Sequence, residues 1–337
     1  MTKNILIDLP IEPTAMERLR SIPGVQVKTI DHIEDFRHVP VEVISDVHIE
    51  FCAFPPQNFA DMRQIEFIQI CSAGYSQLFN LSLPERGVRA SNGRGIFDVP
   101  IAEWNIAMLV NLARDLRGMI RNQDAGIWDR SAQFQVEIRG KTVGLWGYGG
   151  IGRETARMAR ALGLRVHVLS QNGVHPRENI YVVEGTGDPK GVLPDRVFVA
   201  GQEHEFLSDL DFLILAMPLT KKTEGLIGEA ELRSLRPSAF VLNPARGPII
   251  QEGALLQALR EGWIAGAALD THYRYPMLPD HPLWRFPNVI MTPHISGSAL
   301  SPWFLVRAWD IFLQNVERFF SGAPLLNELT ASQLHGN

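Results

Sequence analysis

The clearest chemical signal in the sequence is a glycine-rich loop, GYGGIG at residues 147–152, that follows a strand-like run and precedes a helix-like one. In this setting Gly147 permits a tight turn, Gly149 lets the backbone approach a pyrophosphate, and Gly152 lets helix and strand pack closely. The helix N-terminus then offers unpaired N–H groups and a positive dipole end to phosphates. The loop therefore predicts a dinucleotide site whose contacts are Gly147, Gly149, Gly150, Ile151 and Gly152.

The residue that ends the next strand-like run bears on the form of the dinucleotide. An acidic residue there binds the ribose 2′-hydroxyl of NAD and would repel the 2′-phosphate of NADP. The sequence has Ser170 at this point, followed by Gln171 and Asn172, and the nearest cations are His175 and Arg177. We expect the cofactor to be NAD or NADP, with a slight preference for NADP.

Strand-like apolar runs alternate with helical periodicity along the chain, which is typical of parallel α/β architecture. Early strands are expected at 4–7, 25–27 and 67–70, with a helix at 13–21. A long helical pattern at 99–121 leads into a second block, with strands expected at 142–146, 165–169, 212–215, 239–242, 266–269 and 289–291. After Pro302 an amphipathic helix returns the chain to the first block. The expected fold is α/β with two doubly wound parallel-sheet domains, residues 1–98 with 297–337 and residues 99–296.

The composition is that of an ordinary globular protein. Of the 337 residues 45% are hydrophobic and 20% are charged, which excludes a disordered chain and a fibrous one. The net charge of −5 gives no basic excess to neutralise nucleic-acid phosphates. The two cysteines, Cys52 and Cys71, have no metal-ligand spacing and are expected to be buried free thiols. We expect no metal and no membrane segment, and a cytoplasmic location, because neither a secretory signal nor a spanning stretch is found.

Residues 171–202 depart from this pattern because they are polar, rich in Gly and Pro, and only weakly periodic. Loops of this length are uncommon in compact domains unless they are functional or mobile. One interpretation is a surface excursion with a small hairpin at 180–183. The other is a role at the adenosine end of the cofactor, since the segment leaves directly from the second strand of the block.

Several further motifs occur in an order and spacing that resemble the D-isomer-specific 2-hydroxyacid dehydrogenase family, over nearly the whole chain. These motifs are Ser72-Ala73-Gly74, Ala102-Glu103, the glycine loop, Met217-Pro218-Leu219-Thr220 with Thr223, Asn243-Pro244-Ala245-Arg246-Gly247, Ala268-Leu269-Asp270, Thr292-Pro293-His294-Ile295 and Gly322-Ala323-Pro324-Leu325. The resemblance implies a Rossmann cofactor domain inserted in a flavodoxin-like substrate domain. It also implies hydride transfer between NAD(P)H and a 2-oxo acid or D-2-hydroxy acid in a cleft between the two.

The resemblance assigns a role to each matching residue. His294 matches the acid/base, whose ordinary pKa lets an imidazole exchange a proton near neutrality. Arg246 matches the residue that binds the substrate carboxylate and polarises the carbonyl through its planar fork of donors. Ser72, Ala73 and Gly74 match the substrate-binding backbone N–H groups. Further cofactor contacts are implied at Ser170, Pro218, Thr223, Ala245 and Asp270.

One departure from the family pattern concerns proton transfer. The family carries a glutamate that pairs with the catalytic histidine, and this sequence has Tyr275 at that position, followed by Pro276. A tyrosine supplies no negative charge at neutral pH, so we expect His294 to titrate lower than in relatives. Asp280, His272 and Tyr273 are nearby alternatives for a different network.

The function implied is a 2-oxo acid reductase with a non-standard proton relay, acting on a small-molecule carboxylate. Two alternatives stay open: an enzyme with no carbonyl protonation step, such as formate-like anion oxidation or a lyase-type reaction, and a catalytically weak NAD(P)-sensing binding protein. The family pairs its cofactor domains into homodimers through the crossover helix, and the apolar residues Trp104, Leu109 and Trp128 are consistent with such pairing. Two interpretations stay open for Phe51, Phe54, Tyr75 and Trp303: they shape a pocket for a larger or apolar substrate, or they are ordinary core aromatics.

Overall fold

The computed structural model describes residues 2–131 and 135–335, and it separates into two compact units. Unit 1 comprises residues 1–97, 178–183 and 299–337, and unit 2 comprises residues 98–177 and 184–298. These limits lie within two residues of the predicted ones, with one difference. Residues 178–183 belong to unit 1, although the flanking chain on both sides belongs to unit 2.

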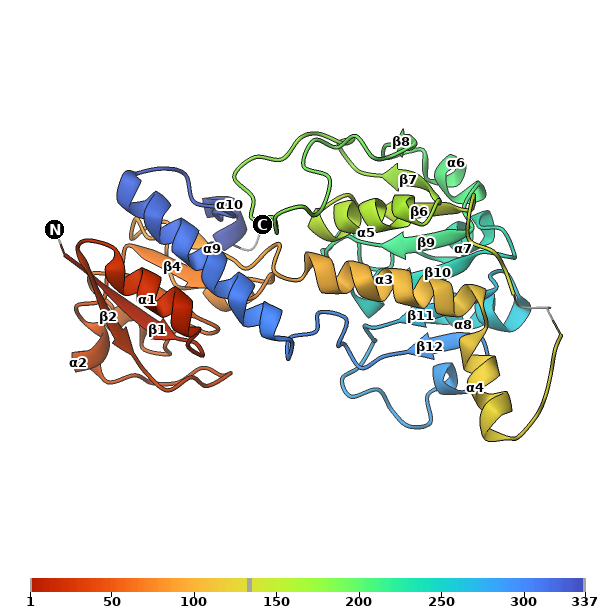
Figure 1. The fold of residues 1–337 in the computed structure, drawn as a ribbon, viewed down its shortest axis with the longest axis horizontal. Helices are drawn as coiled ribbons and strands as arrows, with labels where there is room; N and C mark the ends of the chain where they lie inside the picture. The colour runs from red at the N-terminus through yellow and green to blue at the C-terminus, as the bar shows by residue number, and fades with distance from the viewer. Residues whose placement is uncertain (1, 132–134, 336–337) are drawn as a thin grey trace. The chain divides into compact units, whose positions relative to one another are not determined.

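Unit 1 is built on a parallel sheet with strand order β2-β1-β3-β4-β5. Its strands are β1 (Lys3–Asp8), β2 (Val25–Thr29), β3 (Ile49–Cys52), β4 (Phe67–Ile70) and β5 (Arg89–Ser91), and its helices are α1 (Pro13–Ser21), α2 (Val41–Ile44), α9 (Pro302–Ser321) and α10 (Ala331–Leu334). Helices α1 and α9 lie side by side over one face of this sheet (Figure 1). A flavodoxin-like order of this kind places loops from neighbouring strands at one carboxyl edge.

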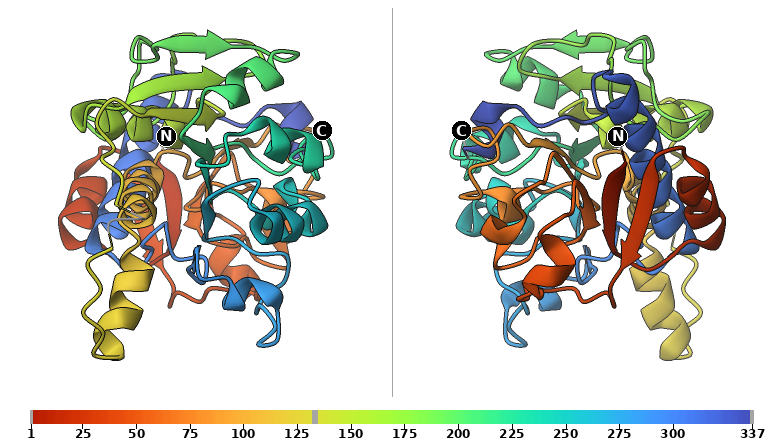
Figure 2. Two further views of the ribbon diagram at one scale, coloured as in Figure 1. Left: turned by 90° about the vertical axis from the view of Figure 1, so that its right-hand side faces the viewer. Right: turned by 90° about the vertical axis from the view of Figure 1, so that its left-hand side faces the viewer.

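Unit 2 contains a larger parallel sheet with order β12-β11-β10-β9-β6-β7-β8. Its strands are β6 (Thr142–Trp146), β7 (Arg165–Leu169), β8 (Arg196–Phe198), β9 (Phe212–Leu215), β10 (Phe240–Asn243), β11 (Gly266–Leu269) and β12 (Val289–Met291). Its helices are α3 (Asp98–Ala113), α4 (Leu116–Asp124), α5 (Gly150–Ala161), α6 (Glu203–Ser208), α7 (Glu229–Ser234) and α8 (Glu252–Glu261). Strand β8 forms the upper edge of this sheet (Figure 2, left).

The cores follow from strands that are buried on both faces. In unit 2, one side of the sheet packs against α3 and α5, and the other packs against α6, α7 and α8. In unit 1, alternate residues of β1 face opposite ways: Ile5 and Ile7 contact the side covered by α1 and α9, while Leu6 belongs to the cluster on the other side. Two doubly wound parallel sheets are therefore present, as the sequence predicts.

Three local expectations are corrected. The single helix expected at 99–121 is two helices, because Asp115 adopts φ 45° and its carboxylate accepts a hydrogen bond from Gly118 N at 3.1 Å, which starts α4. No hairpin forms at 180–183, where the chain lies without strand structure and packs into unit 1. Trp104 and Leu109 are buried in the core of unit 2 rather than available for a partner, whereas Trp128 is 89% exposed.

Both cysteines are buried and unpaired, as expected. Burial raises the pKa of the Cys71 thiol to about 12. Within the described ranges, no group of three or more His, Cys, Asp or Glu side chains is arranged to hold a metal ion. None of the described helices is long and apolar enough to cross a membrane.

Candidate active site

The predicted site residues of unit 2 lie in loops that follow the carboxyl ends of its parallel strands. This edge is where open α/β sheets bind their ligands. The loops come after β6 (residues 147–152), β7 (Ser170), β9 (Pro218 and Thr223), β10 (Ala245 and Arg246), β11 (Asp270 and Tyr275) and β12 (His294).

The glycine loop has the geometry that a dinucleotide requires. Gly147 has φ 104°, and a Cβ there would lie 2.5 Å from the carbonyl oxygen of Ala216. A Cβ on Gly152 would lie 2.6 Å from the carbonyl oxygen of Gly147, so helix α5 and the loop approach too closely for a side chain. Gly149 faces open space and is the N-cap of α5. The first N–H groups of α5 thus follow a glycine with open space around it, which fits a pyrophosphate.

Asp98, the first residue of α3, also approaches this loop. A Cβ on Gly150 would lie 1.7 Å from Asp98 Oδ2. A side chain at position 150 would therefore displace the Asp98 carboxylate from its place beside α5. The carboxylate beside the first turn of α5 is a structural feature that only the tertiary fold reveals.

The chain after β7 carries neutral polar groups at the position expected for an acid. Ser170 N donates to Phe198 O at 3.1 Å, and the Ser170 carbonyl accepts from Gly173 N at 3.2 Å, which closes a turn over Gln171 and Asn172. The imidazole of His175 lies 2.7 Å from the carbonyl oxygen of Asn172. A basic side chain therefore folds back over this turn.

The loop that carries His294 is organised by the buried carboxylate of Asp270. Asp270 Oδ1 accepts from Thr292 Oγ1 at 2.6 Å and from Ile295 N at 2.9 Å, and Oδ2 accepts from Ser296 N at 3.0 Å. His294 N donates to the Asp270 carbonyl at 2.8 Å. These bonds hold His294 at φ 57°, a left-handed conformation that costs a non-glycine residue about 1–2 kcal/mol. Such strain marks residues whose placement serves function.

Two further residues support this loop: Trp104, which the sequence did not indicate as a site residue, and His272, which it offered only as a possible member of a different network. The indole Nε1 of Trp104 donates to Thr292 Oγ1 at 3.2 Å, which connects α3 to the Asp270 network. The imidazole Nε2 of His272 lies 2.8 Å from the Thr292 carbonyl. Since a carbonyl only accepts, Nε2 carries the proton, and Nδ1 is buried without a partner among the described residues. No local signal in the sequence identifies these contacts, because they join distant elements.

Arg246 is presented by a short turn after β10. The buried side chain of Asn243 closes this turn, donating to Arg246 O at 2.8 Å and accepting from Ala245 N at 3.1 Å. A Cβ on Gly247 would lie 2.4 Å from the carbonyl carbon of His272, so the turn rests directly on the backbone after β11. The exposed guanidinium makes one internal bond, from Nη1 to Ala245 O at 2.7 Å, and keeps other donors for a ligand.

Burial and neighbouring charges together set the electrostatic environment of His294. Partial burial lowers the pKa of His294, the positive charge of Arg246 lowers it further, and the charge of Asp270 opposes both. The ring of Tyr275 lies beside His294, with centroids 5.5 Å apart and planes at 50°. The Tyr275 hydroxyl is directed elsewhere and accepts from His272 N at 3.2 Å. The ring of Tyr275 therefore packs near His294, while the catalytic roles of Arg246, His294 and Tyr275 stay predictions.

The remaining predicted cofactor contacts are Pro218 and Thr223, in the loop after β9, and Asp270, directly after β11. Thr223 Oγ1 donates to Pro218 O at 2.7 Å and accepts from Thr220 N at 2.7 Å, which closes the loop after β9. Asp280, considered above as a substitute acid, makes no described bond to His294. A contact between Asp270 and a cofactor stays a prediction, because its two oxygens already bind the loop after β12.

In unit 1, residues 72–74 follow β4 and form an open turn. Ser72 Oγ donates to Gly74 O at 2.7 Å and accepts from Gln77 Nε2 at 2.8 Å, and Asn92 Nδ2 donates to Ala73 O at 2.7 Å. The N–H groups of Ser72, Ala73 and Gly74 make no bond to other described residues of unit 1. Their predicted role as carboxylate donors stays a prediction.

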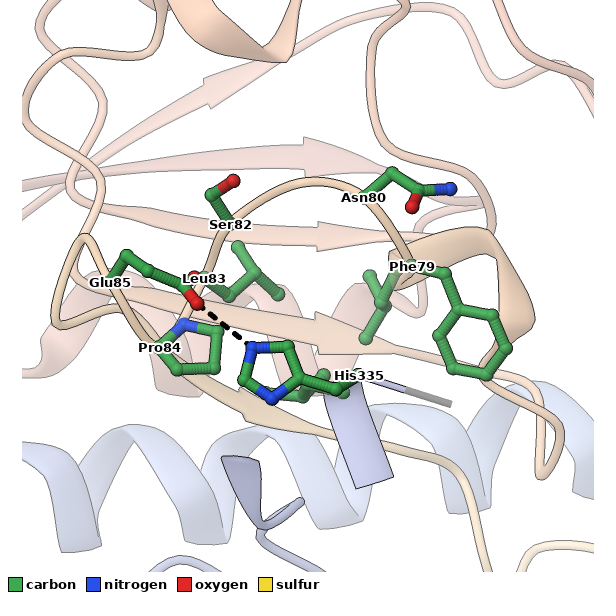
Figure 3. Close-up of a pocket in the computed structure, with 9 residues that line it drawn as sticks. Phe79, Asn80, Ser82, Leu83, Pro84, Glu85 and His335 are labelled. Atoms are coloured by element: carbon green, nitrogen blue, oxygen red, sulfur yellow. Dashed lines mark hydrogen bonds and ion pairs between the residues drawn. The ribbon is translucent and has the colours of Figure 1, made fainter. Parts of the chain in front are cut away.

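A pocket of about 300 Å³ lies elsewhere in unit 1, between residues 78–85 and α10 (Figure 3). Asn80 and Ser82, two of its lining residues, have φ of 64° and 50°. Glu85 and His335 are joined at 2.8 Å. None of the predicted site residues lines this pocket, and no ligand chemistry is evident in it.

Comparison with known proteins identifies the family. Residues 106–296 match the model described as "D-isomer specific 2-hydroxyacid dehydrogenase, NAD binding domain". The chain belongs to this family. A glyoxylate reductase of Thermofilum pendens is 31% identical over 240 residues, which cover 70% of this chain and 67% of that protein.

Other relatives agree with this assignment. A D-3-phosphoglycerate dehydrogenase of Archaeoglobus fulgidus is 28% identical over 96% of this chain, which spans only 58% of that longer protein. The crystal structure of a D-isomer specific 2-hydroxyacid dehydrogenase family protein from Aeromonas salmonicida is 26% identical, with a TM-score of 0.77 over 98% of this chain and 99% of that one. As a member of the family, the chain is an NAD(P)-dependent dehydrogenase or reductase of 2-hydroxyacid type.

Proposed function

We propose that this 2-hydroxyacid dehydrogenase family member interconverts a 2-oxo acid and the corresponding D-2-hydroxy acid, with His294 as acid/base and Arg246 as the carboxylate- and carbonyl-binding residue. One observation carries the proposal: Arg246 and His294 lie in loops at the same edge of the unit 2 sheet, close enough for the charge of one to lower the pKa of the other. The bound nicotinamide supplies or accepts the hydride.

In this proposal the chain's own residues manage charge and protons. The fork of donors on Arg246 holds the substrate carboxylate and stabilises negative charge as it grows on the carbonyl oxygen. The protonated imidazole of His294 delivers a proton to that oxygen during reduction, and the neutral imidazole removes it during oxidation. The backbone N–H groups of Ser72, Ala73 and Gly74 are proposed as donors to the second carboxylate oxygen.

Tyr275 is proposed to be the residue that replaces the family's glutamate. Its hydroxyl is held by the N–H of His272, so only the aromatic ring faces His294. The ring restricts the orientation of the imidazole by packing but offers no charge to stabilise the imidazolium. Tyr275 is therefore a positioning residue in this proposal.

The proposed cofactor is NADPH in preference to NADH. Support comes from the turn after β7, where Ser170, Gln171 and Asn172 carry no acid and His175 folds back over the turn. Exposed apolar side chains on α4 and after it support a further proposal, that two copies of the chain form a homodimer: Ile120, Ile127 and Trp128 are 49%, 57% and 89% exposed.

The experiment is the oxidation of NADPH and of NADH with a panel of 2-oxo acids, including glyoxylate, across pH. We expect turnover of at least one 2-oxo acid, lower KM for NADPH, and loss of reduction by at least about a hundredfold in His294→Ala, the scale of general acid catalysis. Matched tests are Arg246→Lys, which keeps the charge but removes the fork, and His175→Asn, which should raise KM for NADPH only.

The alternative functions give different outcomes. Turnover confined to formate-like anions, or loss of substrate without net change in cofactor, would contradict the proposal in favour of an enzyme that protonates no carbonyl. Tight cofactor binding without any reaction would indicate a sensing protein. Unchanged kcat in His294→Ala would remove the assigned acid/base.

A further inference from the structure

Residues 173–195 connect to both units of the molecule. The chain passes between the units after residues 97, 177, 183 and 298, because residues 178–183 belong to unit 1 while residues 173–177 and 184–195 belong to unit 2. An inserted domain needs only two such passages. The additional pair makes this segment, which we call the strap, a separate covalent connection between the units.

The strap is anchored in unit 1 by a buried tyrosine. Tyr181 is 3% exposed and packs in the apolar core between the sheet, α1 and α9. Its hydroxyl donates to Asp310 Oδ2 at 2.9 Å, and its N–H donates to Asn327 Oδ1 at 3.2 Å. Gly95 has φ 98°, and a Cβ there would lie 2.4 Å from the Tyr181 carbonyl oxygen. Unit 1 is therefore shaped around this side chain and its backbone.

The strap is anchored in unit 2 by a buried aspartate. Asp188 Oδ2 accepts from the hydroxyl of Tyr148 at 2.7 Å and from Leu193 N at 2.9 Å, and Oδ1 accepts from Val192 N at 3.0 Å. Burial opposes ionisation, but the N–H donors of Leu193 and Val192, the hydroxyl of Tyr148 and the charge of Arg153 together lower the pKa of Asp188. The anchor is therefore a carboxylate at neutral pH, which makes its bonds stronger than neutral ones.

A second contact joins the strap to the same part of unit 2. The guanidinium of Arg153 donates to the carbonyl oxygens of Asp188 and His175, the latter at 2.6 Å, and stacks 4.8 Å from the centroid of the Tyr148 ring. Gly187 N donates to the buried carboxylate of Glu154 at 2.6 Å. The strap thus contacts the first turns of α5 through the N–H of Gly187 and the carbonyl oxygens of Asp188 and His175.

The residues that receive the strap flank the glycines of the cofactor loop. Tyr148 lies between Gly147 and Gly149, and Arg153 follows Gly152. The side chains of Tyr148 and Arg153 both bind the strap. A displacement of the strap would therefore change the conformation of the cofactor loop. The strap is in turn fixed by Tyr181 in the other unit.

We propose that Asp188 is a positioning residue for the cofactor loop, acting through Tyr148 and Arg153, and that the strap couples cofactor affinity to the anchoring of Tyr181 in unit 1. A change at Tyr181 then alters dinucleotide binding although Tyr181 does not belong to the unit that carries the loop. This inference requires only cofactor binding, and it is independent of the substrate and of the proton-transfer roles proposed above.

The test is a double-mutant cycle on the Kd of NADPH and of NADH, measured by cofactor fluorescence well below the Tm of every variant. Tyr148→Phe keeps the ring over Arg153 but removes the bond to Asp188, and we expect a Kd increase of about tenfold, the scale of one charged hydrogen bond. Tyr181→Phe keeps the buried ring but removes the bond to Asp310, and we expect an increase of about threefold. In the double variant we expect the same Kd as in Tyr148→Phe alone, because the Tyr181 anchor acts on the cofactor loop through the Tyr148–Asp188 bond.

Controls separate coupling from loss of stability. Phe59→Leu reduces packing on the opposite side of the unit 1 sheet, in the cluster that does not include Tyr181, and should leave Kd unchanged. The proposal is overturned if Tyr181→Phe leaves Kd at the wild-type value, if Phe59→Leu raises Kd as much, or if the two effects multiply in the double variant. Asp188→Asn, which keeps the shape but not the charge, should reproduce most of the Tyr148→Phe effect.

Discussion

At the residue scale, the ring of Tyr275 lies beside His294 in unit 2, and the charge of Arg246 acts on the same imidazole. Burial and the charge of Arg246 both disfavour its protonated form. Tyr275, which is 58% exposed, contributes its ring but directs its hydroxyl to His272. The electrostatics of the site therefore favour the neutral imidazole, which is the form that removes a proton in oxidation.

A pH dependence follows from this lowered pKa. Reduction needs the protonated imidazole, so its kcat/KM should be highest at low pH and fall as pH rises through a value below 6.5. Oxidation needs the neutral form and should persist down to the same value. In Tyr275→Glu the new carboxylate should raise the pKa of His294, by about one unit for each 1.4 kcal/mol of ion pairing. The pH profiles of reduction and of oxidation should both shift to higher pH by the same amount.

Tyr275→Gln is the control for this measurement, because it resembles glutamate in size and carries no charge. Initial rates of reduction and oxidation between pH 5 and about 9 would give the apparent pKa of each pH profile. Equal apparent pKa values in Tyr275→Glu and Tyr275→Gln would show that charge at this position does not control His294.

Glu50 is a second titratable residue in an unusual setting. It lies in the middle of β3, is fully buried, and neither of its carboxyl oxygens has a hydrogen-bond partner among the described residues. Burial, with the charge of Asp8 adding to it, raises the pKa of Glu50 well above its usual range. The folded chain therefore keeps a proton that the unfolded chain releases.

This retained proton should make stability depend on pH. Because the folded state binds more protons, the free energy of unfolding falls as pH rises above the unfolded pKa of Glu50, about 4.3. Glu50→Gln should remove that fall and be the more stable form at pH 8, whereas Glu17→Gln on the exposed face of α1 should follow the wild type. Urea unfolding across pH gives the values, and parallel curves for Glu50→Gln and wild type would contradict the assignment.

At the element scale, the strands that could be predicted are those with continuous apolar runs, such as β6 and β9, because they are buried on both faces. Strand β3 was missed because Glu50 interrupts its apolar pattern, and the short edge strands β5 and β8 each begin with an arginine. The break between α3 and α4 could not be predicted, because the side chain of Asp115 creates it without a proline.

The residues of the candidate site likewise divide into those that the sequence could locate and those that it could not. Residues that belong to contiguous motifs, such as the glycine loop, Arg246 and His294, could be located from the sequence. Trp104 and Asp98 could not, because their roles depend on contacts between elements far apart in the chain. His272 could be named as a nearby group, but its contact with the Thr292 carbonyl could not be predicted. A hairpin at 180–183 was one interpretation of the sequence. It is wrong because an apolar run that is buried in another unit has the same local sequence pattern as a strand.

Gly247 tests how closely the loops after β10 and β11 depend on each other. A Cβ at Gly247 would lie 2.4 Å from backbone atoms of His272, so Gly247→Ala must separate the two loops. We expect a loss of about 1–3 kcal/mol in the free energy of unfolding and a large fall in kcat/KM, since Arg246 is adjacent. Gly253→Ala is the matched control: it lies in α8 with open space around its Cβ, and should be stabilising by about 0.5–1 kcal/mol. Similar behaviour of the two variants would contradict the proposed loop contact.

At the scale of the whole molecule, α4 and the residues after it leave apolar side chains in water. Leu116, Ile120, Ile127 and Trp128 are each at least 44% exposed, although α3 immediately before them is largely buried. Clustered exposed apolar residues of this kind mark interaction surfaces. The proposed partner is a second copy of this chain.

The homodimer predicts a specific response to a charge in this surface. Light scattering on the wild-type chain should give twice the 37.7 kDa of one copy. Ile120→Glu should give a single copy, because dimerisation would bury the new carboxylate without a partner. Val192→Glu is the control, since Val192 is 72% exposed in unit 2 but lies outside the α4 region, and it should remain dimeric. A monomeric wild type, or a dimer that survives Ile120→Glu together with Trp128→Glu, would show that this apolar surface serves another purpose.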